Sequence, residues 1–520
     1  MHVPDVSPRN RLDVRVTGGV VRGVRDGRIL AWRGIPYAAP PVGSLRFRAP
    51  RPVLPWTGIR DASQFGNVSP QPYRGQFRGA AANVPAGEDC LTVNVLAATV
   101  TRRKRLGMPV MVFIHGGGYS AGSSQDFPGQ GETFVRSGQV VYVSFNYRLG
   151  ALGYLNFSRY STSERPIESN LGLRDQVAAL DWVRANIRGF GGDPNNMTLF
   201  GESAGGNAVT TLLTTPSARG LFARAIAQSP PPNAVYTKEH SDGWAAEFIA
   251  LLRTDTAKPG DDLANPVPAN ELLESAPVAS LNRAALIMQV RTPDSQPGTF
   301  CLAPVVDGDF LPERPLDAFT GGRSHPIPLI IGTNAREGSV FRGRFDILPK
   351  SPNRIRSLFE HAPPTSTEAM GLAYPGLPEA RIAADFAGDF AFWFPSLSVA
   401  CGHSQVASVH AYRFDLAPRL LHLLGFDATH GIELFALFDN VRTPFARTMT
   451  ALGGRAQFSK AGERMRRHWL RFALIGGLDA SWPDYSPSSR QTLIIDEFDR
   501  VESDPHRERR LAWEAFLPLG

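Results

Sequence analysis

Runs of consecutive apolar residues recur along the chain, rich in β-branched side chains and flanked by glycine. They lie at residues 110–114, 140–145, 197–200, 328–332, 409–414 and 492–495. Strands that are apolar on both faces are typical of a largely parallel sheet with helices covering both sides. The six runs therefore predict the buried strands of an α/β fold.

Helical patterns lie between these runs. Apolar side chains recur every three or four positions over residues 175–187 and again over 458–474. This spacing predicts helices that pack one face against the sheet. Two polar, proline-rich stretches, 258–276 and 352–377, are the best candidates for excursions from the sheet, either as surface loops with short helices or as insertions that shape a pocket.

Composition removes several classes of protein. With 520 residues, 42% hydrophobic and 20% charged, the chain can bury a large core, which excludes a disordered or collagen-like protein. No run of uncharged apolar residues is long enough to span a bilayer, so we expect no membrane span. The first eight residues lack the charged and apolar regions of a signal peptide, which predicts a cytoplasmic location.

The net charge of +7 would ordinarily favour nucleic acid or an anionic membrane as a partner. However, only five of the 55 basic residues are lysine, and the arginines are scattered. One basic cluster, residues 102–105, precedes the first apolar run. It is interpreted as a solvated loop, with an anion-binding patch as the alternative. We therefore expect no nucleic-acid partner.

The three cysteines, Cys90, Cys301 and Cys401, are too few and too far apart for a disulfide framework or a zinc site. We interpret them as buried small hydrophobic residues. No metal or cofactor is expected.

The strongest local motif is Gly201-Glu202-Ser203-Ala204-Gly205, a G-x-S-x-G directly after the run 197–200. A serine nucleophile at the end of a strand needs a sharp turn into a helix, and small neighbours permit that turn. The small and then helix-compatible residues that follow would bring a helix N-terminus beside Ser203. The motif also occurs by chance, but its strand-then-helix context favours a nucleophile.

A second motif, His115-Gly116-Gly117-Gly118, ends the run 110–114. Acyl transfer develops negative charge on a carbonyl oxygen, and glycine N–H groups can approach that oxygen without a Cβ in the way. A tight turn is the alternative for glycines after a strand. Together with the serine motif, the glycines predict an oxyanion hole made by the N–H groups of Gly117, Gly118 and Ala204.

A serine nucleophile needs a base, and the base needs an acid to hold its tautomer. Among eleven histidines, His430 lies in a loop after the run 409–414, where its side chain can return to the carboxyl edge of the sheet. His115 is better placed as the lead-in to the glycines, and His403, His410 and His422 are weaker rivals. Glu337 follows the run 328–332 and is the candidate acid, although a glutamate before glycine is ordinarily a solvated turn residue.

The chain resembles the type-B carboxylesterases, the family that includes bacterial p-nitrobenzyl esterases, liver carboxylesterases and cholinesterases. The resemblance covers nearly the whole chain and includes the order Ser203, Glu337, His430. It rests on the serine motif, the glycine loop, the segments around Glu337 and His430, and residues 32–38, 40–43, 45–47, 56–58, 88–91, 94–95, 146–150, 170–176, 186–194, 304–308 and 482–483.

The resemblance implies an α/β-hydrolase fold and a serine carboxylesterase that acts on a small-molecule ester through an acyl-enzyme. It implies Ser203 as nucleophile, His430 as general base and then acid, Glu337 as its orienting carboxylate, and Gly117, Gly118 and Ala204 as oxyanion donors. Glu202 and Ser229 match positions of a buried polar pair beside the triad, although a structural role is equally plausible. A monomer or homodimer is expected. Length alone favours three or four domains, but one signature from residue 32 to 482 predicts a single domain over residues 1–520, with insertions around 235–325 and 345–400.

The sequence departs from the family in four places. Arg336 stands where the family usually has aspartate, and Ser69 stands where many secreted members have a cysteine that pairs with the counterpart of Cys90. Prolines 230–232 follow Ser229, where the family tends to have glycine. Between Ser69 and Cys90 the aromatic residues are Tyr73 and Phe77 rather than the tryptophan of cholinesterases, which disfavours choline esters.

Two alternatives to an esterase remain. The same fold serves as a non-catalytic adhesion module in some relatives, but those typically lose the nucleophile that this chain keeps. An amidase, a carbamate hydrolase or a lipase would use the same triad.

The aromatic residues in 390–394 either line an acyl pocket or form a buried core cluster.

Overall fold

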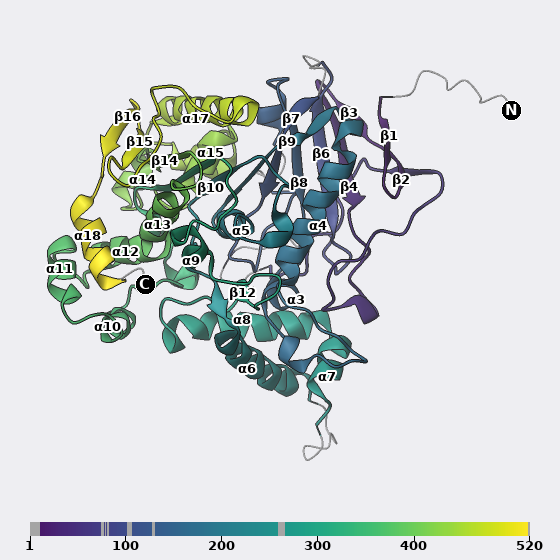
Figure 1. The fold of residues 1–520 in the computed structure, drawn as a ribbon, viewed down its shortest axis with the longest axis horizontal. Helices are drawn as coiled ribbons and strands as arrows, with labels where there is room; N and C mark the ends of the chain where they lie inside the picture. Colours follow the sequence, from purple (N-terminus) through teal and green to yellow (C-terminus); the bar gives the residue numbers. More distant parts are fainter. Residues whose placement is uncertain are drawn as a thin grey trace.

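The computed structural model describes residues 11–73, 77, 80, 83–100, 107–126, 131–257 and 266–517 (Figure 1). The basic cluster 102–105 and residues 258–265 of the first proline-rich stretch lie outside the described residues.

The described residues form an eleven-stranded sheet in the order β16-β15-β14-β13-β10-β9-β7-β8-β6-β4-β3. The seven strands from β15 to β8 are parallel, and antiparallel strands extend the sheet at both edges. The largely parallel α/β sheet is therefore confirmed. The strands are β3 (Val24–Asp26), β4 (Ile29–Pro36), β6 (Thr92–Ala98), β7 (Met108–Ile114), β8 (Val141–Phe145), β9 (Gly192–Glu202), β10 (Arg224–Gln228), β13 (Leu329–Asn334), β14 (Val409–Phe414), β15 (Gln491–Ile495) and β16 (Arg500–Ser503).

All six apolar runs lie in the parallel part of the sheet. Four of these strands are longer than predicted: β7 begins at Met108, β9 at Gly192 and β15 at Gln491, and β13 continues to Asn334. The antiparallel strands were not predicted, and neither was the parallel strand β10. β3 and β16 are exposed edge strands of polar sequence, and β4 carries an irregularity between Trp32 and Ile35 that interrupts its pattern.

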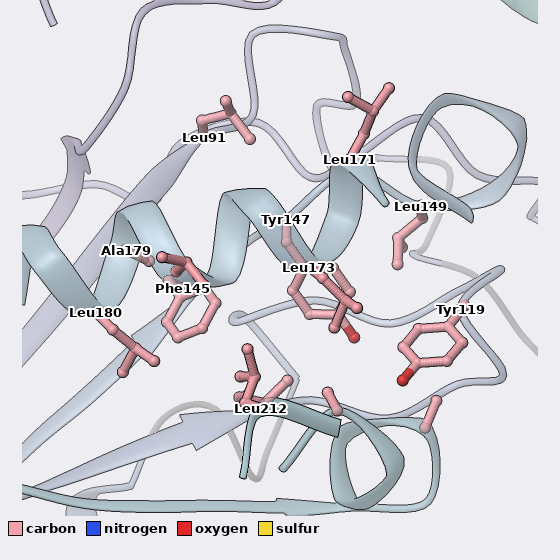
Figure 2. Close-up of a cluster of buried hydrophobic side chains, with 14 of the residues drawn as sticks. Leu91, Tyr119, Phe145, Tyr147, Leu149, Leu171, Leu173, Ala179, Leu180 and Leu212 are labelled. Atoms are coloured by element: carbon pink, nitrogen blue, oxygen red, sulfur yellow. The ribbon is translucent and has the colours of Figure 1, made fainter. Parts of the chain in front are cut away.

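The parallel strands bury both faces because successive side chains point to opposite sides. In β7, Val110 and Val112 pack in a core that includes helix α4 (Leu171–Asn186), whereas Met111 and Phe113 pack in a second core with helix α17 (Arg455–Ile475). These helices match the two predicted ones. Figure 2 shows part of the first core, where Leu173 and Leu180 of α4 lie beside Phe145, Tyr147 and Leu212.

Further helices surround the sheet (Figure 1). They are α2 (Glu132–Val135), α3 (Gly150–Tyr154), α5 (Ala204–Leu212), α14 (Arg419–Leu423), α15 (Ile432–Leu437), α16 (Pro444–Met449) and α18 (Arg507–Phe516). Small sheets are formed by β1 (Asp13–Val16), β2 (Gly19–Arg22) and β5 (Ile59–Asp61), and by β11 (Tyr236–Thr237) and β12 (Val305–Val306).

The two intervals expected to hold insertions consist mainly of helices outside the large sheet. Residues 235–325 contain α6 (Lys238–Thr256), α7 (Ala269–Ser275), α8 (Val278–Ser295) and α9 (Pro315–Thr320). Residues 345–400 contain α10 (Pro352–Glu360), α11 (Ser366–Ala373), α12 (Ala380–Gly388), the π-helical turn η7 (Asp389–Trp393) and most of α13 (Phe394–His403). Residues 341–394 form a third apolar cluster with α18, which we call the cap cluster. The single-domain organisation stays a prediction.

Among the helices described, none has the length and apolar character needed to cross a membrane.

Candidate active site

The turn between β9 and α5 holds Ser203 in an unusual backbone conformation. Its φ is +57° and its ψ is −124°, a combination that costs a non-glycine residue about 1–3 kcal/mol. A Cβ on Gly201 would lie 2.6 Å from the backbone of Gly205, and a Cβ on Gly205 would lie 2.1 Å from the Ile114 carbonyl oxygen. The two glycines of the motif are therefore required by close backbone packing around Ser203.

His430 and Glu337 approach Ser203 from the neighbouring strands. Ser203 Oγ donates to His430 Nε2 at 2.9 Å, and His430 Nδ1 donates to Glu337 Oε2 at 2.6 Å. Glu337 lies in the turn η5 (Glu337–Val340) directly after β13, and His430 lies in the loop between β14 and α15. The carboxyl ends of parallel strands meet at one edge, so residues distant in sequence come together there.

The carboxylate of Glu337 is held from its far side. Its Oε1 accepts the N–H of Asn334 at 2.6 Å and the hydroxyl of Ser229 at 2.6 Å. Both oxygens therefore have fixed donors, and Oε2 is left directed at His430. Ser229, one of the two supporting candidates, therefore lies in contact with Glu337.

The glycine loop after β7 has backbone conformations that favour glycine. Gly117 has φ +111° and Gly118 has φ +58°, and a Cβ on Gly117 would lie 2.3 Å from the Ala121 carbonyl oxygen. Gly118 and Ala204 line the same pocket as Ser203. Ala204 is the first residue of α5, where backbone N–H groups have no partner within the helix.

The rival histidines have other partners. His115 stacks on Tyr147 with ring centroids 4.4 Å apart, and burial lowers its pKa to about 4. His403 Nε2 lies 2.8 Å from the Ile327 carbonyl oxygen, and His422 Nδ1 lies 2.6 Å from Asp427 Oδ1. His410 contacts residues 483 and 484. Of the described histidines, His430 is the one that hydrogen-bonds to Ser203.

Comparison with known proteins decides the family. Residues 10–368 match the model of the carboxylesterase family. The chain is also 34% identical over 501 residues to the para-nitrobenzyl esterase of Bacillus subtilis (strain 168), covering 95% of this chain and 96% of that protein. The chain belongs to the carboxylesterase family.

Other relatives agree with this assignment. The carboxylesterase is 34% identical to the phenmedipham hydrolase of Pseudarthrobacter oxydans, covering 94% of this chain and 96% of that protein. A solved PNB esterase structure superposes with a TM-score of 0.80 at 32% identity, over 97% of this chain and all of that one. A thermophilic PNB esterase gives a TM-score of 0.82 at 32% identity, with the same coverage. The protein is accordingly a carboxylic ester hydrolase with the α/β-hydrolase fold.

Three buried carboxyl groups surround His430 in this carboxylesterase. Glu337 binds Nδ1, and Glu202 Oε1 lies 3.3 Å from Nε2. Glu433 lies behind Glu337, where its Oε2 accepts the side-chain N–H of Asn334 at 2.7 Å. Burial opposes the charged imidazolium, but the nearby carboxylates outweigh it and raise the pKa of His430 above its usual value. Burial raises the pKa of Glu202, the charge of His430 opposes that rise, and the neighbouring acids add to it.

Glu433 was not identified from the sequence. Burial, together with the charge of Glu337, raises its pKa to about 7. A sequence signal was present, because Glu433 is the one charged residue in the apolar segment 432–438. That pattern marks a buried charge, although it does not say which residues face it.

A pocket open to solvent lies over Ser203. It is lined by apolar and neutral side chains, including Phe341 and Phe392, and no charged side chain of the described residues lines it. The aromatic side chains of the segment 390–394 have different surroundings. Phe392 lines the pocket with its ring 4.5 Å from that of His430, whereas Phe394 stacks on Trp513 in the cap cluster.

Two of the departures from the family also have a structural setting. Pro231 forms part of the pocket wall. Ser69 Oγ accepts the N–H of Leu149 at 3.0 Å, and Cys90 is a buried free thiol whose pKa burial raises to about 12. Ser69, which stands where many secreted members have a disulfide-bonded cysteine, is thus joined to Leu149 by a hydrogen bond.

Proposed function

We propose that this carboxylesterase hydrolyses carboxylic esters through an acyl-enzyme with a Ser203–His430–Glu337 triad. The observation that supports this most is the continuous hydrogen-bonded chain from Glu337 through His430 to Ser203, at 2.6 and 2.9 Å, beneath an apolar pocket. Because Glu337 accepts from Nδ1, the neutral imidazole presents its unprotonated Nε2 to Ser203.

In the first half of the reaction, Ser203 Oγ attacks the ester carbonyl carbon while His430 Nε2 takes its proton. The carbonyl oxygen becomes an oxyanion, which accepts hydrogen bonds from the N–H groups of Gly117, Gly118 and Ala204. The imidazolium then gives its proton to the leaving alkoxy oxygen. The alcohol departs, and the acyl group remains on Ser203.

In the second half, water replaces the alcohol. His430 takes a proton from water as the oxygen attacks the acyl carbon, and the same N–H groups hold the second oxyanion. His430 returns the proton to Ser203 Oγ as the acid leaves. Glu202 and Ser229 support this cycle, Glu202 by its charge beside Nε2 and Ser229 by fixing Glu337.

The neutral lining of the pocket favours small uncharged esters as substrates. The same lining disfavours a cationic ester such as a choline ester, because no carboxylate of the described lining residues would face the cation. The names of two relatives, a para-nitrobenzyl esterase and a fumonisin B1 esterase, support an ester as the substrate.

Hydrolysis of p-nitrophenyl esters of graded acyl length tests this proposal. Ser203→Ala should lower kcat by about 10⁶-fold, as loss of a serine nucleophile does elsewhere. The matched control is Ser241→Ala, which removes a buried hydroxyl from α6. A fluorophosphonate probe should label the unmodified protein at Ser203 and leave Ser203→Ala unlabelled.

Full activity in Ser203→Ala would refute the mechanism. No hydrolysis of any ester or amide by the unmodified protein would favour the non-catalytic binding role instead.

A further inference from the structure

Arg336 connects three segments that lie far apart in the sequence. It directly precedes Glu337, and only 11% of its side chain is exposed. Its guanidinium donates to the loop before His430 and to helix α12. Arg336 therefore links the turn that carries Glu337, the loop that carries His430 and helix α12 of the cap.

The first connection runs to the loop that carries the base. Arg336 Nη1 donates to Asp427 Oδ2 at 2.8 Å and to the Gly425 carbonyl oxygen at 3.0 Å. The backbone N–H of Arg336 also donates to the Ala428 carbonyl oxygen at 3.0 Å. Asp427 has φ +53°, a conformation that a non-glycine residue keeps only when its surroundings hold it. His430 follows three residues later, so the shape of this loop sets the position of the imidazole.

The second connection runs to the cap. Arg336 Nε donates to Asp385 Oδ1 of α12 at 2.7 Å. Behind this ion pair the backbones touch, because a Cβ on Gly338 would lie 1.9 Å from the Ala384 carbonyl oxygen. Helix α12 continues into η7, which carries Phe392 against His430. A displacement of α12 would therefore also displace Phe392 in the pocket wall.

An arginine suits this junction better than a lysine would. The planar guanidinium presents donors in several fixed directions, so a single group can bind two carboxylates and a carbonyl at once. Asp427 is shared with Arg381 at 2.9 Å and with His422 at 2.6 Å. Two negative charges at a mostly buried site are therefore compensated, with Arg336 at the centre.

We propose that Arg336 is a positioning residue, which fixes the Glu337 turn and the His430 loop against each other and against the wall that bears Phe392. The proposal rests on the triad proposed above. Arg336 touches neither Ser203 nor the pocket lining, so it acts through the residues that it holds.

Replacement by alanine tests this role. Arg336→Ala should lower kcat by about 100-fold, because a displacement of about 1 Å in a catalytic group has that effect, while KM changes little. The matched control is Arg464→Ala, which removes an arginine of α17 that binds Asp499 at 2.8 Å through two nitrogens and is 26% exposed. The control should keep its kcat.

Guanidinium rescue distinguishes positioning from a general loss of stability. Arg336 lines an open groove together with Arg342, Lys350 and Arg381, so a small cation can enter the space that alanine leaves. Guanidinium chloride, far below concentrations that unfold proteins, should restore part of the kcat of Arg336→Ala. Sodium chloride at the same concentration should not.

If Arg336→Ala does not fold, Asp427→Asn, Asp385→Asn and Arg336→Lys provide the test. Each should lower kcat, with Arg336→Lys affected because its single amine cannot bind both carboxylates. Unchanged kcat in the folded variants, equal losses in Arg464→Ala, or equal responses to both salts would overturn the proposal. Activity in Ser203→Ala would instead overturn the triad itself, so the two failures are separable.

Discussion

Two regions of the molecule are stabilised by different interactions. One is the set of residues at the carboxyl ends of the central strands, and the other is the cap cluster. At the strand ends, hydrogen bonds dominate, and Glu337 alone accepts three, from His430, Asn334 and Ser229. In the cap cluster, aromatic contacts dominate. Trp513 of α18 packs against Phe386 and Phe394 with ring centroids 5.0 and 6.0 Å apart.

The two kinds of interaction suit two different roles, catalysis at the strand ends and substrate selectivity in the cap. Hydrogen bonds between charged groups are directional, and they fix atoms at the distances that proton transfer requires. Apolar contacts are non-directional and tolerate changes of shape when volume is kept. Substitutions at the strand ends should therefore change kcat, whereas substitutions in the cap should change which esters are accepted.

One polar network lies within the cap. Tyr374 donates to Asp389 at 2.5 Å and accepts the indole N–H of Trp513 at 2.7 Å, while Arg509 binds Asp389 at 3.1 Å. Burial raises the pKa of Asp389 to about 6. The network ties α18 to η7, so the π turn that carries Phe392 is anchored from behind even though its neighbours are apolar.

The largest effect within this comparison is expected at Glu337. Glu337→Gln keeps the shape of the side chain, but an amide no longer selects the imidazole tautomer that offers Nε2 to Ser203. We expect kcat to fall by about 10⁴-fold, as when the triad acid is replaced by its amide elsewhere. Steady-state kinetics on a p-nitrophenyl ester measure this directly.

Glu433→Gln is the matched control, since Glu433 is an equally buried acid that binds Asn334 rather than His430. Its loss of kcat should be far smaller. Equal losses in the two variants would mean that the whole buried carboxyl cluster, and not the bond to Nδ1, sets the rate.

The strand ends were largely predictable from the sequence, and the reasons are local. The glycines around Ser203 are needed because backbone approaches backbone there, so the motif records the geometry. Glu337 and His430 follow apolar strands, and parallel strands end at one edge. Glu433 was missed because its partners, Asn334 and Gln228, come from other strands.

The cap was less predictable for a related reason. Its residues contact segments far away in sequence, as Phe394 does with Trp513, and no local pattern encodes such a pairing. The segment 390–394 is uniformly apolar, so sequence could not decide between pocket and core. Both Phe392 and Phe394 belong to the cap cluster, but of the two only Phe392 also lines the pocket. Arg336 was visible only as a departure from the family, and its carboxylate partners come from α12 and the His430 loop.

A middle-sized effect is expected in the pH profile of Glu202→Gln. In the proposed mechanism His430 must be neutral to accept the proton of Ser203, so kcat/KM should fall as pH falls through the pKa of His430. Burial lowers that pKa, but the charges of Glu202 and Glu337 raise it above its usual 6.5. Removing the Glu202 charge should therefore move the acid limb to lower pH, by about one unit.

The control is Glu88→Gln, which changes a largely buried carboxyl bound to Arg46. Its acid limb should coincide with that of the unmodified protein. An unmoved limb in Glu202→Gln, or a shift to higher pH, would show that Glu202 acts by hydrogen bonding rather than by its charge.

The smallest effect on kcat, and the sharpest test of the comparison, is expected from Phe392→Ala and Phe394→Ala. Phe392→Ala enlarges the pocket and should shift preference toward longer acyl chains, changing kcat/KM ratios by about tenfold, the usual worth of a small difference in fit. Phe394→Ala should lower stability by about 3–5 kcal/mol, as loss of a buried phenylalanine does, and leave the chain-length preference unchanged. Thermal unfolding and the same ester series separate the two outcomes. If both variants change the acyl-chain preference to the same extent, the packing of the whole cap determines the selectivity. The ring of Phe392 alone would then not determine it.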